Sequence, residues 1–146
     1  MPTSDFGLSY DDNEIVISLR NIADRGRNLA QAHAAVGELA VGMVHERYAL
    51  ELGPGGIPLP KNSAYTKRQK RKLGRINKIL QSTGIMKART FYQLRGVGLI
   101  YGTSDRKARR HYQGIGVPVR DVWTPDPENV EEWTLTYRDF ILSGVV

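Results

Sequence analysis

The chain has 146 residues, the usual length of a single domain with its own buried core. It contains no cysteine, which excludes disulfides and cysteine-rich zinc sites and makes a reducing cytoplasm the simplest compartment. The N-terminal stretch MPTSDFGLSYDDNE lacks the segments of a signal peptide, and no apolar run approaches the ~18 residues of a membrane span, so we expect a soluble protein without membrane contact.

The net charge of +6 is concentrated in the middle third of the chain. Residues 1–51 carry 8 acidic and 4 basic side chains, residues 52–104 carry 11 basic and no acidic ones, and residues 105–146 carry 6 basic and 7 acidic ones. A block of one sign repels itself. It therefore either stays extended in solvent or meets an acidic partner surface.

Two elements are predicted in the first third. Residues 13–20 alternate, with Ile15, Ile17 and Leu19 on one side, which is the period of a half-buried strand. From residue 28 to 50 the apolar positions recur at spacings of three, four and one, which predicts the longest helix of the protein. Gly37 and Gly42 keep that helix narrow, which permits close approach by a sheet or a neighbouring subunit.

A long irregular segment is expected next. Proline and glycine between residues 53 and 60 end the helix. Residues 67–78, KRQKRKLGRINK, hold 7 basic side chains, and either a short surface helix or a mobile arm fits them. We expect residues 61–78 to be mobile in a free subunit and ordered on assembly, so their amides in the free subunit should exchange almost as fast as those of an unstructured peptide.

A β-hairpin and two helices are predicted in the last part. Residues 90–94 and 97–101 have strand character, with Arg95-Gly96 as the turn. A short helix over residues 103–112 with Ser104 or Asp105 as N-cap comes next, and then an amphipathic helix over residues 127–142 with Asp126 as N-cap.

The predicted fold is therefore α+β. A long N-terminal helix packs on a small, mostly antiparallel sheet, with an extended basic loop and a C-terminal amphipathic helix. Residues 1–146 are expected to form one domain, in which residues 53–78 are an irregular basic loop or arm.

A catalytic site is hard to assemble from this sequence, so we expect a protein that is not an enzyme and that uses no cofactor or metal. His33 and His45 lie a little over three helical turns apart, about 18 Å, and cannot share a metal. The glycines of Gly96-Val97-Gly98 and Gly102 do not match the dinucleotide-binding pattern and are better explained by the hairpin.

The basic residues carry the functional signal. They suit the phosphates of a nucleic acid, with tyrosines nearby that stack on bases, but no base-reading motif is present. A solvated charged face or a contact to an acidic protein ring explains them equally well. The candidate contact residues are Lys67, Arg68, Lys70, Arg71, Lys72, Arg75, Lys78, Arg106, Arg109, Arg110, Arg120 and Trp123.

The order of motifs from residue 79 onward resembles the bacteriophage virion morphogenesis proteins, also called tail completion proteins. That family shows "iL-x-x-tG-x-L", a hairpin ending in "vGT", then "YA-x-x-H-x-x-G" and "iPaR". The matching positions here are Ile79-Leu80 with Thr83-Gly84, Tyr101-Gly102-Thr103, Ala108 with His111 and Gly114, and Val117-Pro118-Val119-Arg120. Two positions depart from the family: Ile57-Pro58-Leu59-Pro60 replaces a proline-tryptophan pair, and Val122-Trp123 replaces a phenylalanine.

The resemblance implies a structural virion protein of a tailed phage, located in the neck where the tail meets the head. It implies a ring of six or twelve copies around the DNA channel, bound to neighbouring neck, portal-side or tail-tube-side proteins, with possible non-specific contact to genomic DNA. The protein would occupy the host cytoplasm during assembly and the virion afterwards. The alternative is a small basic nucleic-acid-binding protein, and an assembly chaperone absent from the finished particle is more distant.

Overall fold

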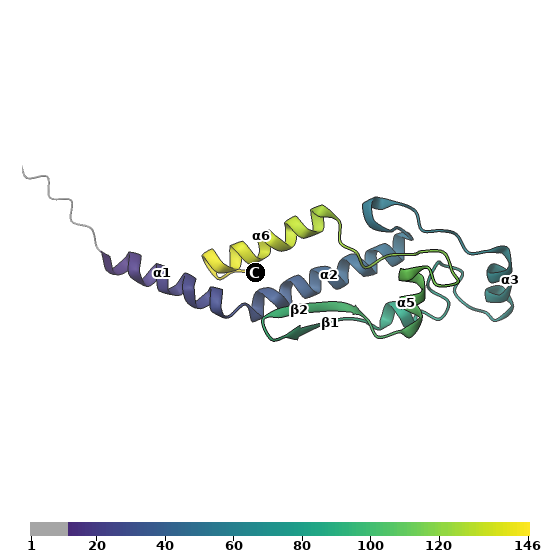
Figure 1. Ribbon diagram of the computed structural model, residues 1–146, viewed down its shortest axis with the longest axis horizontal. Coiled ribbons are helices and arrows are strands. Elements are labelled where there is room, and N and C mark those ends of the chain that lie inside the picture. The colour runs from purple at the N-terminus through teal and green to yellow at the C-terminus, as the bar shows by residue number, and fades with distance from the viewer. Residues whose placement is uncertain (1–11) are drawn as a thin grey trace, which may run out of the picture.

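The computed structural model describes residues 12–146 and confirms the predicted α+β class. Its elements are α-helices and one two-stranded antiparallel hairpin, arranged along an elongated body (Figure 1). None of the helices in this described part is long and apolar enough to cross a bilayer.

Helix α2, Ala30–Leu50, is the central element, and its 21 residues make it the longest helix in the described chain, as predicted. The expected stripe is its buried face, which includes Ala32, Val36, Ala40, Met43 and Val44. The helix ends where Glu51 takes the left-handed conformation, with φ of 58°, before the predicted glycines and prolines are reached.

The hairpin packs closely on α2 at Gly37, as the narrow surface of the helix predicts. A methyl group at Gly37 would lie 2.4 Å from the ring of Tyr92, which belongs to strand β1, Thr90–Arg95. Gly42 differs, because it is exposed and a methyl group there would meet nothing within 4 Å. Only Gly37 is therefore required for close approach.

These two glycines give opposite predictions for the same substitution. Gly37→Ala should lower the free energy of unfolding by about 1–3 kcal/mol, because the Tyr92 ring must move out of a packed interface. Gly42→Ala should raise it by up to about 1 kcal/mol, because alanine is the better helix former and meets no obstacle. Urea denaturation of both variants measures the difference, and a stabilised Gly37→Ala would show that the ring moves away at no cost.

The predicted strand over residues 13–20 is wrong: the segment belongs to helix α1, Asp12–Arg27. Ile15, Leu19 and Ile22 also recur at spacings of four and three, and no strand formed by the described residues lies beside them to accept a strand's hydrogen bonds. α1 extends away from the body and is exposed over most of its length (Figure 1). It is held at its C-terminal end, where Arg25 Nε donates to the carbonyl of Ile141 at 2.8 Å.

The hairpin lies where the sequence predicts it, with a turn one residue later. β1 pairs with β2, Gly98–Thr103, in a register that places Thr90 opposite Thr103 and Arg95 opposite Gly98. Gly96 has φ of +56°, and Val97, expected in the second strand, is 97% exposed in the loop. The sheet has two strands in the described chain, since the expected third is α1.

The segment after α2 is more regular than predicted. A short 3-10 helix, Pro54–Gly56, is followed by helix α3, Ala64–Lys72, and by the single turn α4, Ile85–Ala88. Ser63 caps α3, because its hydroxyl oxygen accepts a hydrogen bond from the backbone N–H of Thr66 at 3.1 Å. Of the two forms expected for the basic segment, the helix is the one observed over its first half.

The last two helices match their predicted caps. Asp105 caps α5, Arg106–Gln113, by accepting from the N–H of Lys107 at 2.9 Å, and Asp126 caps α6, Pro127–Ser143. α6 runs beside α2 (Figure 1). Arg47 of α2 joins the two helices through its ion pair with Asp126. The core lies around the C-terminal half of α2, where Val44, Tyr48 and Val122 are fully buried.

Candidate interaction site at the basic end

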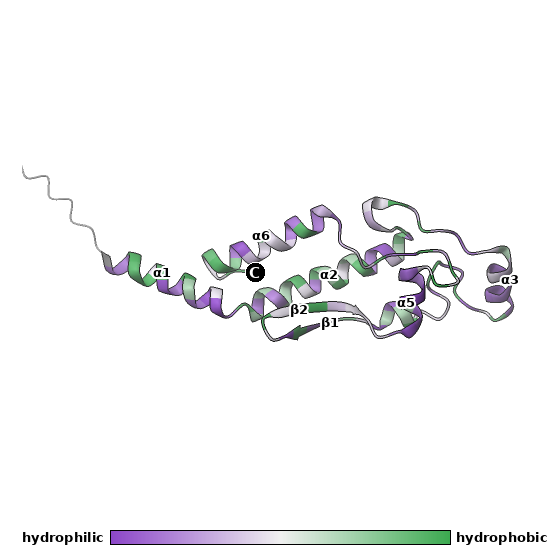
Figure 2. Ribbon diagram, viewed as in Figure 1, coloured by the Kyte–Doolittle hydropathy of each residue, from purple (hydrophilic) through white to green (hydrophobic). Residues whose placement is uncertain are grey.

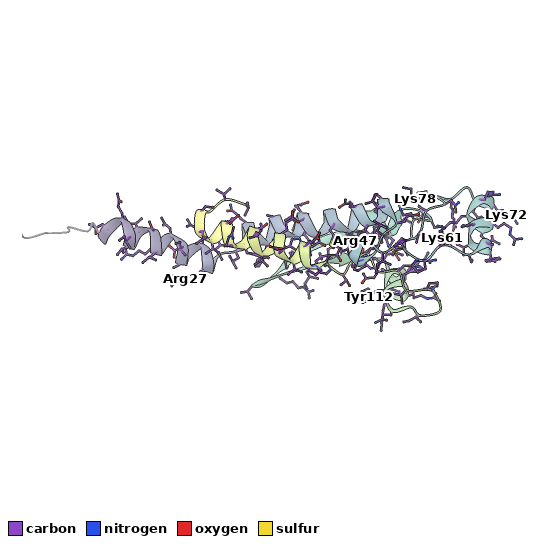
Figure 3. The ribbon with its side chains drawn as sticks, turned by 90° about the horizontal axis from the view of Figure 1, so that it is seen from above. Arg27, Arg47, Lys61, Lys72, Lys78 and Tyr112 are labelled. Atoms are coloured by element: carbon purple, nitrogen blue, oxygen red, sulfur yellow. The ribbon has the colours of Figure 1, made fainter. Side chains whose placement is uncertain are left out.

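Helix α3 carries the exposed positive charge at one end of the molecule. Lys67, Arg68, Arg71 and Lys72 are exposed on it, and Lys72 lies at the tip (Figure 3). α3 and α5 are hydrophilic over most of their length (Figure 2). No carboxylate occurs between residues 52 and 104, so the exposed charges of α3 and of the segment that follows it are all positive.

The other exposed candidates extend this surface. Arg75 and Lys78 follow α3, and Lys78 Nζ donates to the carbonyl of Ala49 at 3.4 Å. The remaining exposed cations, Arg106, Arg109 and Arg110, are on α5. Chain segments that are distant in sequence thus bring most of the predicted contact residues to the same half of the molecule.

Lys70 and Arg120 differ from the other candidates because both are buried, each only 7% exposed. Lys70 Nζ donates to the carbonyl of Lys78 at 2.6 Å, and Arg120 donates to the carbonyls of Pro60 and Lys61 at 2.8 and 3.0 Å. Burial and then repulsion by Arg120 lower the pKa of Lys70, against a weaker attraction from Glu51, and burial lowers the pKa of Arg120. Lys70 and Arg120 therefore place positive charge inside the molecule at the end that carries α3.

A cavity of about 330 Å³ lies between α3 and α5, and both buried cations line it. Arg75 and Lys107 line it as well, together with His111, and no carboxylate is among its lining residues. His111 Nδ1 is buried without a hydrogen-bond partner. The cavity is therefore strongly electropositive.

His111 should make stability depend on pH. Burial, followed by repulsion from Arg120 and Arg110, lowers its pKa below the ordinary value of 6.5, against a smaller effect of Asp105. Below about pH 6.5 the histidine binds a proton in the unfolded chain more readily than in the folded protein. The contribution of His111 to the free energy of unfolding is therefore fully present above about pH 6.5 and falls as the pH decreases. Urea denaturation between about pH 7 and pH 5 should show a smaller decrease for His111→Gln than for the unchanged protein. An equal decrease would exclude His111 as its source.

Trp123 is a packing residue. It is half-buried, and its ring meets those of Tyr48 and Tyr112 edge to face, with centroids 6.2 and 6.4 Å apart. Its carbonyl accepts a hydrogen bond from the Tyr101 hydroxyl at 2.7 Å. These contacts explain why an aromatic residue is present at this position without a partner molecule.

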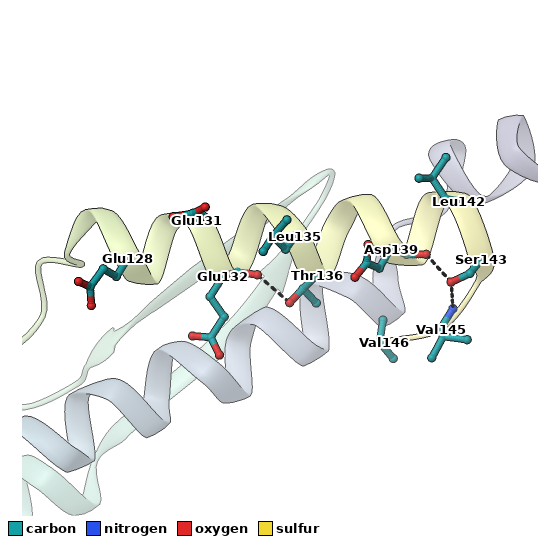
Figure 4. Close-up of a pocket in the computed structure, with 10 residues that line it drawn as sticks. All are labelled: Glu128, Glu131, Glu132, Leu135, Thr136, Asp139, Leu142, Ser143, Val145 and Val146. Atoms are coloured by element: carbon teal, nitrogen blue, oxygen red, sulfur yellow. Dashed lines mark hydrogen bonds between the residues drawn. The ribbon is translucent and has the colours of Figure 1, made fainter.

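A second charged surface was not predicted from the sequence. The outer face of α6 and the residues after it form a shallow groove of about 650 Å³ that combines carboxylates with exposed apolar side chains (Figure 4). Its acidic residues are Glu128, Glu131, Glu132 and Asp139, and Leu135 and Leu142 lie among them. The seven acidic residues after residue 104 were the available signal, but no prediction connected them with one face of α6.

No group of three histidine, cysteine or acidic residues within residues 12–146 is close enough to hold a metal ion. His33 Nδ1 is hydrogen-bonded to the Tyr137 hydroxyl at 2.6 Å, which links α2 to α6.

No family model, curated protein or solved structure matches this chain.

Proposed function

We propose that this protein is a structural, non-enzymatic subunit of a tailed bacteriophage. Its place is the neck, where it completes the tail and forms one layer of a ring around the DNA channel. The motif order from Ile79 to Arg120 supplies the biological setting, and the separation of charge on the body supplies the physical support.

That separation of charge is the observation that carries the proposal. Exposed cations cover α3, which lies at one end of the body. The acidic groove lies on α6, which runs beside α2 farther from that end (Figure 1). Surfaces of opposite sign attract each other within about the Debye length, roughly 8 Å at physiological salt. This attraction fixes the orientation in which two proteins meet.

A ring follows if the two surfaces meet between copies. The basic end of one subunit and the α6 groove of the next are different patches, so their contact is heterologous and produces a closed ring where the rotation closes. The exposed cations that the groove does not cover would then meet an acidic layer above or below. Those layers are neighbouring neck, portal-side or tail-tube-side proteins.

Binding of DNA is the second candidate, and the absence of carboxylates from residues 52–104 favours it. The same exposed cations would neutralise phosphates, and affinity would fall with salt by a log-log slope near −0.9 for each phosphate. The protein contact is preferred because the positive end carries charge without a helix or strand placed to read bases.

The composition of purified virions tests the proposal. Quantitative mass spectrometry of particles from the phage that encodes this chain should find a fixed number of copies, equal to six, twelve or another ring number. Particles separated into heads and tails should retain the protein at the joined end. Its absence from complete virions would refute the structural role and favour an assembly chaperone or a nucleic-acid-binding protein.

A further inference from the structure

Lys70 and Arg120 are buried cations without a paired carboxylate. None of the ion pairs in the described part of the chain involves either residue. Burying a charge is costly unless it is paired or fully hydrogen-bonded, and one or two neutral carbonyls provide only part of that compensation. Two such groups side by side repel each other. The folded chain therefore keeps a positive charge that it does not neutralise internally.

Two carboxylates act on residues of the cavity, and both accept backbone hydrogen bonds outside it. Glu51 attracts Lys70 from a distance, and its Oε1 accepts a hydrogen bond from the N–H of Ile79 at 2.5 Å. Asp105 acts on His111, and its Oδ1 accepts from the N–H of Lys107 at the start of α5. Neither residue lines the cavity.

The cavity is open to a ligand from outside. Arg75 and Lys107 at its rim are exposed, and Lys70, Arg120 and the unpartnered Nδ1 of His111 lie deeper. A volume of about 330 Å³ accommodates a side chain or a small ligand, since ligand pockets commonly begin near 300 Å³. Four cationic side chains therefore converge on one space.

The rest of the lining indicates which anion fits. It includes five uncharged polar residues, and Leu73, Leu80, Met86 and Val117 contribute apolar surface. Apolar walls add affinity only when the ligand also has apolar surface to bury, which a phosphate group does not. A carboxylate on a hydrocarbon stem, beside another apolar group, can pair with the cations of the lining and also contact its apolar residues.

We propose that the cavity between α3 and α5 is an anion-binding site whose ligand is a carboxylate side chain from an acidic and apolar segment of a partner protein. The carboxylate pairs with Lys70 and Arg120, and the stem and its neighbour contact the apolar wall. Arg75 and Lys107 attract the segment to the rim. The inference stands on the cavity alone and does not depend on the assignment to a phage neck.

Two blocked dipeptides test this site on the full-length protein. Acetyl-Leu-Glu-amide and acetyl-Leu-Gln-amide have nearly the same shape and differ in charge. In NMR titrations, the glutamate form should shift the Arg120 Nε–H and Met86 methyl signals to saturation. The glutamine form should bind about tenfold more weakly, since bonds to charged groups are about twice as strong as neutral ones.

Variants at the rim confirm the location without disturbing the buried cations. Lys107→Gln and Arg75→Gln should each weaken binding of the glutamate dipeptide several-fold. Arg95→Gln removes the same charge from an exposed position of the hairpin outside the lining and should leave binding unchanged. Equal binding of the two dipeptides, no shift at Arg120, or equal loss from all three variants would overturn the site. Tighter binding of inorganic phosphate than of the glutamate dipeptide would overturn the choice of a carboxylate.

Discussion

Replacement of Arg47 by methionine should cost about 3 kcal/mol of the free energy of unfolding, the lower end of the usual result of removing one partner of a buried ion pair, because Asp126 is partly exposed. Arg47 is 6% exposed, and its Nη2 donates to Asp126 Oδ2 at 2.8 Å. Its Nη1 donates to the carbonyl of Thr124, so it joins α2 to the segment that leads into α6. Methionine preserves most of the buried stem but satisfies none of these acceptors.

An exposed ion pair provides the matched control. Arg138 bonds Asp139 at 2.8 Å, with the two side chains 58% and 56% exposed. Arg138→Met should therefore cost no more than about 1 kcal/mol, because water screens the pair and replaces its hydrogen bonds. Urea denaturation of the two variants measures both effects. Equal losses would show that burial of Arg47 adds nothing to its contribution.

The other contacts of Asp126 affect the loss expected from Arg47→Met. Asp126 caps α6 and its Oδ1 also accepts from the N–H of Gly55 at 2.6 Å, so it retains partners when Arg47 is removed. In a double-mutant cycle with Asp126→Asn, the two losses should be less than additive, since the residues belong to one network. Additive losses would mean that the carbonyl contacts, and not the ion pair, carry the stabilisation.

The elements predicted well from the sequence are those in which one short-range signal dominates. The spacing of apolar residues defined α2, and Asp126 followed by Pro127 defined the start of α6. The strand prediction for residues 13–20 was wrong because the segment fits both the strand period and the helix period and neither of its faces is buried. An alternating pattern forms a strand only where a neighbouring strand supplies hydrogen bonds and a core covers its apolar face.

The candidate site was predicted in part, for a related reason. Charge is readable from the sequence, so the exposed cations of α3 and α5 were identified. Burial of a cation depends on segments that meet only in the fold, and Arg120 is buried because its guanidinium reaches the carbonyls of Pro60 and Lys61, about sixty residues away in sequence. No local pattern distinguishes Lys70, which is buried, from Lys72, which is not.

The largest functional effect is expected from removing the exposed charge of α3. A variant with Lys67, Arg68, Arg71 and Lys72 replaced by glutamine keeps good helix formers and leaves the buried Lys70 in place, so the fold should be preserved. If this surface contacts an acidic protein layer, heads and tails should accumulate unjoined, and the yield of infectious particles should fall by orders of magnitude. Each lost pair weakens one contact only modestly, but a ring repeats the loss in every subunit.

A control with equal charge loss separates this contact from a general effect of net charge. Replacing Arg20, Arg27, Arg89 and Arg95 by glutamine also removes four exposed cations, none of them on α3, and should leave head–tail joining intact. Electron microscopy of lysates and plaque counts measure the outcome. Normal particles from the α3 variant, combined with loss of salt-dependent DNA binding by the purified protein, would instead assign the surface to DNA, because only a phosphate contact predicts that combination.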